Sequence, residues 1–203
     1  MAILGTMTSS ERRKSYLSRI RQNQSLEDIY SEDRKKEWES FSSEDQKKIE
    51  ESLAFIGFVS ASDLPIDPLC HENEDPPLPD IRSTLDGVTY YFELGEITDE
   101  GLARRASRSR KTGQITFGFF SQEDPLLKML REKCARSYPT KDAPVDLLLY
   151  YSKQYPHAQM LAECLAIHEA EITGLIGRSQ YARVWIYSTW GSPKVLWKRL
   201  RSG

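Results

Sequence analysis

The chain has 203 residues, of which 39% are hydrophobic and 29% charged, and its formal net charge is −2. This length accommodates one substantial domain with a core, together with a helical appendage. A nearly neutral chain is not a general binder of polyanions, so any contact with nucleic acid has to use a local basic patch. No apolar run is long enough to cross a membrane, and the apolar start of the chain is too short for a signal peptide.

The cysteines bear on the compartment in which the chain works. Cys70, Cys134 and Cys164 are odd in number and far apart, and no two of them form a C-x-x-C pair. Free thiols in a reducing compartment fit this pattern better than a disulfide framework does. A structural zinc site is disfavoured for the same reason. We therefore expect a cytoplasmic protein.

The first sixty residues carry the signals of charged helices. Residues 10–23 form a short amphipathic pattern, and Ser25 is suited to cap a second helix. Ser42 or Ser43, followed by two acidic residues, marks the start of a third helix. Gly57 is expected to end that helix. Residues 1–42 are therefore predicted to form a helical N-terminal extension.

A hairpin follows an acidic, proline-rich connector at 61–79, which should be extended or irregular because proline cannot continue a helix or a ladder. Asp86-Gly87 separates two β-prone runs and is one of the strongest short signals for a tight hairpin turn. Asp80 stands at the entry to the first strand, and Glu93 lies inside the second.

The remaining segments complete an α/β pattern. We expect a helix at roughly 100–111, a short aromatic strand or packed loop at 115–120, and a helix that begins at Asp124-Pro125. A buried central strand at 145–151 and a helix at 157–177 should follow. The chain should end with a strand at 183–188 and an edge strand at 194–198. The strands on either side of the crossover helix should be parallel neighbours. The sequence therefore predicts an α/β domain over 43–203, with a mixed central sheet flanked by helices.

The position of Glu93 suggests chemistry. A carboxylate between Phe92 and Leu94 in a strand points to a partly buried face, where ionisation is costly unless a cation compensates. Two carboxylates brought together by a hairpin, Asp80 and Glu93, form a natural site for a hard divalent cation.

The Pro79-Asp80 pair, Glu93 in the next strand and the strand-helix-strand unit that follows resemble the PD-(D/E)xK, or restriction-endonuclease-like, superfamily. The likeness covers roughly residues 43–190. It implies a restriction-endonuclease-like core in which Asp80 and Glu93 bind Mg²⁺ or Mn²⁺ during hydrolysis of DNA phosphodiesters. The residue two positions after the glutamate is usually lysine in that family, and here it is Gly95.

The segment Phe92-Glu93-Leu94-Gly95-Glu96 also resembles the corresponding motif of uncharacterised bacterial members of this superfamily. Their motif is apolar-Glu-x-Thr-Glu, and they lack the lysine in its usual place. The resemblance implies that a helix acid completes the metal site and that another element supplies the cation. Candidates are Glu50 or Glu51 for the acid, with Glu72 and Glu74 as rivals, and Lys133 for the cation, ahead of Arg104, Lys111 and Lys128. Glu96 points away from Glu93 in a regular strand and returns to the site only if a bulge forms at Gly95.

Contacts with nucleic acid are expected from the basic helix, through Arg104, Arg105, Arg108 and Lys111, with steep salt dependence. Three functions stay open. The first is a metal-dependent nuclease, and the second is a catalytically silent relative that binds nucleic acid, or a protein through the N-terminal helices. The third is a protein-interaction domain with no role in binding nucleic acid. Plainer interpretations also stand. Asp80 could end a strand, Glu93 could pair with an arginine such as Arg82 across the hairpin, and the basic helix could be a solvated face.

Overall fold

The computed structural model describes residues 7–22, 32–67, 71–85, 87–98, 124–152, 160–189 and 194–201. Two compact units are present, Met1–Phe55 and Ile56–Gly203. Their boundary falls within helix α4 (Ser43–Ala61), later than the expected boundary after residue 42. The helix predicted at 100–111 and the aromatic segment at 115–120 lie outside the described residues.

The first unit is helical, as its sequence predicts. It contains α1 (Ser9–Gln22), α3 (Glu32–Glu39) and the beginning of α4. A small core gathers Tyr16, Leu17, Phe41 and Ile49. Ser42 caps α4, because its hydroxyl accepts a hydrogen bond from the Asp45 N–H at 3.1 Å.

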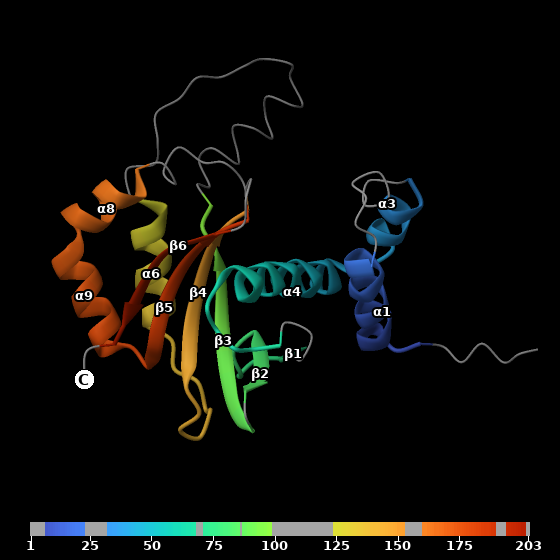
Figure 1. Ribbon diagram of the computed structural model, residues 1–203, viewed down its shortest axis with the longest axis horizontal. Helices are drawn as coiled ribbons and strands as arrows, with labels where there is room; N and C mark the ends of the chain where they lie inside the picture. The colour runs from blue at the N-terminus through green and yellow to red at the C-terminus, as the bar shows by residue number, and fades with distance from the viewer. Residues whose placement is uncertain are drawn as a thin grey trace, which may run out of the picture. The chain divides into compact units, whose positions relative to one another are not determined.

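The second unit is built on a six-stranded mixed sheet in sequential order, β1 to β6 (Figure 1). The strands are β1 (His71–Asn73), β2 (Ile81–Leu85), β3 (Val88–Glu96), β4 (Val145–Tyr151), β5 (Tyr181–Ser188) and β6 (Lys194–Leu200). The β2–β3 hairpin is antiparallel, β3–β4 and β4–β5 are parallel, and β6 runs antiparallel to β5 at the edge. The predicted α/β class, the hairpin and the parallel pair of central strands are confirmed.

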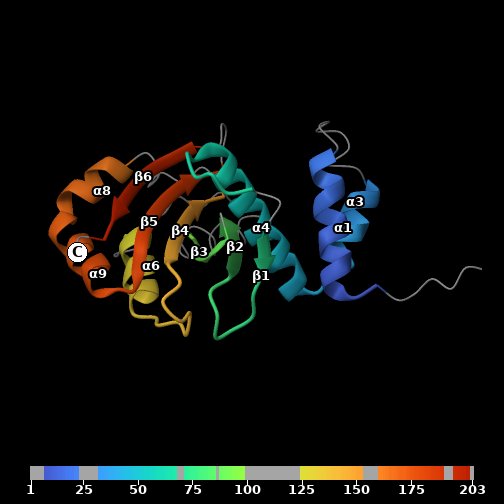
Figure 2. The ribbon, with the colours of Figure 1, turned by 60° about the horizontal axis from the view of Figure 1, so that its bottom comes forward.

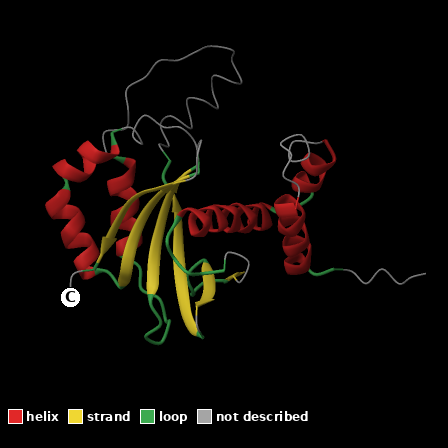
Figure 3. Ribbon diagram, viewed as in Figure 1, coloured by secondary structure: helices red, strands yellow, loops and turns green. Residues whose placement is uncertain are grey.

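Helices cover both faces of this sheet (Figures 2 and 3). On one face lie α6 (Pro125–Cys134), α8 (Leu161–Ile167) and α9 (Glu169–Arg178), packed on inward residues such as Leu147 and Leu149. On the other face, Phe58 from the last turns of α4 makes edge contacts with the rings of Phe92, Trp185 and Tyr187. The central strands are therefore covered on both faces, and β4 is buried along its whole length.

Two local features differ from the predictions. The single helix expected at 157–177 is two helices that meet at His168, whose backbone φ of −107° departs from helical geometry. The connector also contains the short strand β1, which its proline-rich sequence did not predict. Glu72 on β1 lies opposite Arg82 in the strand register and forms an ion pair with it. Opposite charges facing each other across two strands favour this short pairing.

Gly57 does not end α4, which continues to Ala61. The glycine lies where the helix approaches β5 so closely that a Cβ atom would collide with the hydroxyl of Tyr187. The need for this close approach, rather than for a helix stop, accounts for glycine here.

We therefore predict that Gly57→Ala lowers the free energy of unfolding by about 1–3 kcal/mol, because it overpacks the interface between α4 and β5. Removing the hydroxyl as well, in Gly57→Ala/Tyr187→Phe, should restore at least half of the loss. Urea unfolding of the wild-type chain and of these two variants measures both effects. Helix propensity alone predicts the opposite sign for the alanine variant, so a stabilised Gly57→Ala protein would contradict the packing explanation.

Candidate functional site

A lysine lies among the buried residues of α6. Asp124 caps this helix by accepting a hydrogen bond from the Leu126 N–H at 2.8 Å, and Pro125 occupies the first turn. From there the buried positions Leu126, Leu130 and Lys133 follow the i, i+4, i+7 spacing of one helix face. The apolar stripe thus carries Lys133 onto the face of the helix that packs against the sheet.

The partner of Lys133 is Glu93, on the central part of β3. The Lys133 Nζ donates to Glu93 Oε1 at 2.5 Å and also to the Leu94 carbonyl oxygen. Arg136 Nη1 donates to the same Oε1 at 2.7 Å. The side chains of Glu93 and Lys133 are only 2% and 10% exposed, whereas that of Arg136 is 52% exposed. One buried carboxylate is therefore compensated by one buried and one half-exposed cation, as burial of charge requires.

The absence of a side chain at Gly95 leaves space for the Lys133 side chain. A Cβ atom at position 95 would lie 2.9 Å from Leu149 Cδ2, 3.1 Å from Met129 Sδ and 3.3 Å from Lys133 Cε. The stem of Lys133 therefore passes through space that a side chain at residue 95 would need. Position 95 is on the same face of β3 as Glu93, because side chains alternate along a strand.

Asp80 reaches the same point of β3 from the neighbouring segment. Its Oδ2 accepts a hydrogen bond from the Leu94 N–H at 2.8 Å. The pairing of β2 with β3 ends at Ile81 opposite Phe92, so Leu94 lies beyond it. Asp80 and Lys133 satisfy the N–H and the C=O of this one residue, next to Glu93. The structure thus pairs Lys133 directly with Glu93, and it joins Asp80 to them through the backbone of Leu94.

Two tyrosines line the cluster as neutral groups. Burial raises the pKa of Tyr138 and that of Tyr181 above their usual value, and the Glu93 carboxylate adds to both shifts. The Tyr181 hydroxyl donates to the Lys133 carbonyl oxygen at 3.0 Å and so joins β5 to the last turn of α6. Neither phenol adds negative charge at neutral pH, so Glu93 is the anion that Lys133 meets.

The other predicted acids lie elsewhere. The β3–β4 register runs without a shift through Glu96, so the bulge that would return Glu96 to the site is not formed, and its carboxylate is hydrogen-bonded to Ser152. Glu72 and Glu74 form ion pairs with Arg82. Arg82 thus pairs with these two acids, and the arginine that pairs with Glu93 is Arg136 instead.

The helix acids belong to the first unit. Glu50 is exposed on α4 and Glu51 is buried there, in an ion pair with Lys47. Within the described ranges, no group of three or more histidine, cysteine, aspartate or glutamate side chains is placed to hold a metal ion. The predicted nucleic-acid contacts Arg104, Arg105, Arg108 and Lys111 lie outside the described residues.

Sequence reasoning did not identify Arg136 or the Leu94 carbonyl as parts of the site. Arg136 follows the end of α6, where no helical periodicity predicts its direction. The backbone carbonyl has no sequence signal of its own. Lys133 did carry a signal, because a lysine occupies a position of the helix that its leucines mark as buried.

A second charge cluster lies on the opposite face of the sheet. Asp146 on β4 is 1% exposed, and its Oδ2 accepts from Arg183 Nε at 2.7 Å and from Trp185 Nε1 at 3.0 Å. Its other oxygen, Oδ1, is buried without a hydrogen-bond partner among the described residues. Burial raises the pKa of the Asp146 carboxyl group, although Arg183 opposes the shift. This cluster is a costly structural feature of the core.

The buried ion pair of Lys133 and Glu93 yields a stability prediction. Lys133→Met should lower the free energy of unfolding by about 3 kcal/mol, because Glu93 stays buried with only Arg136 as its counterion. Arg131→Met is the matched control on the same helix. Its ion pair with Glu171 is 45% and 36% exposed, so its loss should cost at most about 1 kcal/mol. Equal losses in urea unfolding would contradict a strong buried pair.

Asp146 yields a prediction about pH. Because the pKa of its carboxyl group is higher in the folded state, the folded protein binds this proton more tightly than the unfolded chain. The contribution of Asp146 to stability is therefore largest at low pH and falls as pH rises above about 4, where the unfolded group ionises. Asp146→Asn should lose this dependence, so its stability relative to wild type should increase with pH.

Comparison with known proteins gives no further guide. No family model matches the chain, and neither the curated proteins nor the solved structures yielded a match.

Proposed function

We propose that this chain is a divalent-metal-dependent nuclease that hydrolyses DNA phosphodiesters, with the cation of its centre supplied by Lys133 from α6. One observation carries the proposal. The Lys133 stem lies 3.3 Å from the place of a Cβ at Gly95, and its ammonium group binds Glu93. The lysine missing two residues after the glutamate is thus replaced from a helix packed against the same spot.

The site offers carboxylate and carbonyl oxygen atoms, which are the ligand type that hard divalent cations bind. Asp80, Glu93 and the Leu94 carbonyl would hold Mg²⁺ or Mn²⁺, with water filling the remaining positions, since Mg²⁺ commonly binds through only one or two carboxylates. The bound metal would polarise the phosphate and activate a water molecule. Because the described residues include no third acid at the site, the carbonyl and the water molecules matter more than in a carboxylate-rich centre.

The role of Lys133 follows from its charge and its attachment. Its ammonium group is held by Glu93 and the Leu94 carbonyl, so its position is fixed before substrate arrives. A fixed cation of this kind stabilises negative charge that develops on phosphate oxygens in the transition state. Arg136, half exposed beside it, offers a second positive group toward solvent.

A second candidate function is favoured by the same contacts. Glu93 Oε1 already receives Lys133 and Arg136, and its side chain is 2% exposed. Because Lys133 and Arg136 already compensate the charge of this carboxylate, it attracts a metal ion less strongly. This arrangement suits a catalytically silent member of the same fold that binds nucleic acid, or a protein partner through the N-terminal helices.

Membrane insertion through a helix has no support in the described part of the chain, where no helix is both long and apolar enough to span a bilayer. A cytoplasmic setting stays a proposal. It is supported by the free thiols of Cys134 and Cys164, whose pKa values burial raises to about 11 and about 12.

The nuclease proposal predicts Mg²⁺- or Mn²⁺-dependent cleavage of plasmid and oligonucleotide DNA by the wild-type chain. Asp80→Asn and Glu93→Gln should each lower the rate by about 100-fold or more, because each removes a metal ligand. Glu132→Gln, an exposed glutamate on α6, is the matched control and should cleave like wild type. Circular dichroism of each variant at the assay temperature establishes that it is folded.

The outcomes separate the two functions. Undiminished cleavage by Glu93→Gln would assign the activity to another site or to a contaminant. Wild type that binds DNA without cleaving it under any metal would establish the silent member instead.

A further inference from the structure

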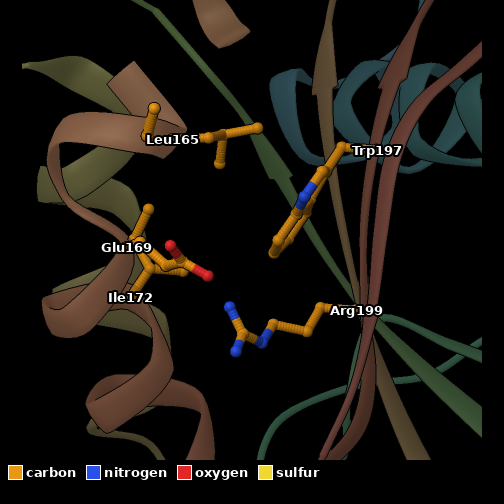
Figure 4. A pocket seen from close by; sticks show the side chains of 6 residues that line it. Leu165, Glu169, Ile172, Trp197 and Arg199 are labelled. Atoms are coloured by element: carbon orange, nitrogen blue, oxygen red, sulfur yellow. The ribbon is translucent and has the colours of Figure 1, made fainter. Parts of the chain in front are cut away.

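A hollow lies between the helices α8 and α9 and the edge strand β6 (Figure 4). Its volume is about 210 Å³, and its lining consists of Leu165, Ala166, Glu169, Ile172, Trp197 and Arg199. Sites for drug-sized ligands typically measure about 300–1,000 Å³, so this hollow suits a smaller molecule. It is formed by other elements than those of the Lys133 cluster.

A bulge in β6 aims two of these side chains into the hollow. Val195 pairs with Tyr187 and Trp197 pairs with Ile186, so Leu196 is an extra residue in the ladder. Without it, Trp197 would share a face with Val195, on the side of Tyr187. With it, Trp197 lies opposite Ile186, which belongs to the core beneath α8 and α9. Bulges commonly redirect side chains beside functional sites.

The hollow also holds two opposite charges that do not pair. Glu169, at the start of α9, and Arg199, on β6, both direct their charged groups into it (Figure 4). Among the described residues, neither side chain forms an ion pair or a hydrogen bond with the other or with a third group. An acid and an arginine facing one gap, over an aromatic ring, leave both charges ready for a ligand.

We propose that this hollow binds a free α-amino acid with an apolar side chain. The ligand carboxylate would be received by the planar guanidinium of Arg199, which suits two parallel hydrogen bonds. Its ammonium group would lie between Glu169 and the face of Trp197, since both a carboxylate and an indole ring attract a cation. Its side chain would pack on Leu165 and Ile172, which supply the apolar wall.

This inference is independent of the nuclease proposal, and its test uses no DNA. The probes are L-leucine and L-phenylalanine, titrated into the full chain by calorimetry and by ¹H–¹⁵N NMR. A ligand of this size is expected to bind with a Kd between about 10 µM and 1 mM. N-acetyl-L-leucine lacks the ammonium group and L-leucinamide lacks the carboxylate, so each should bind at least about 10-fold more weakly.

Variants locate the binding. Glu169→Gln and Arg199→Gln should each weaken L-leucine binding by about 10-fold or more, a loss of one charged contact. The matched controls are Glu163→Gln on α8 and Lys198→Gln, whose ammonium group lies 4.5 Å from the Trp185 ring centre on the opposite face of the sheet. Both controls should bind within twofold of wild type.

Several results would overturn the assignment. They are no binding of either amino acid at about 10 mM, equal affinity for the acetylated or amidated probe, and undiminished binding by Glu169→Gln and Arg199→Gln. A Glu169–Arg199 ion pair that merely closes the hollow predicts the first of these results.

Discussion

The second unit depends on how one buried charge is compensated. Glu93 lies in a strand covered on both faces, where an unpaired carboxylate would be too costly to keep ionised. Lys133 meets it from α6, so this buried ion pair joins that helix to β3. Gly95 follows from the same contact, because any larger residue would compete with the lysine stem. The absence of lysine from position 95 and its presence at 133 are therefore one structural solution.

The local part of this arrangement could be predicted from the sequence. Asp86-Gly87 gave the hairpin turn, the run at 145–151 gave the central strand, and the leucine stripe after Asp124 gave the helix that carries Lys133. What could not be predicted depends on partners distant in the chain. Gly57 looked like a helix stop because its neighbour Tyr187 is 130 positions away. Arg136 was missed for the same reason, since only the packed fold directs it to Glu93.

The two faces of the sheet use charge differently. Toward α6, Glu93 is balanced by two cations, and the backbone of the next residue, Leu94, is held by Asp80 and Lys133. On the opposite face, Asp146 is held by Arg183 and Trp185, and one of its oxygens is left without a partner, which suits structure at some cost. At the edge, the bulge in β6 turns Trp197 and Arg199 toward α8 and α9. One sheet thus supports a candidate catalytic centre and a separate small-molecule hollow.

The central claim is that Lys133 takes the place of a lysine at position 95, and moving the lysine tests it most directly. Lys133→Ala should abolish metal-dependent DNA cleavage, Gly95→Lys/Lys133→Ala should regain at least about 10-fold over it, and Gly95→Ala/Lys133→Ala should not. The two double variants share the added Cβ, so they differ only in the ammonium group and its stem. Cleavage by Lys133→Ala at the wild-type rate would contradict the account.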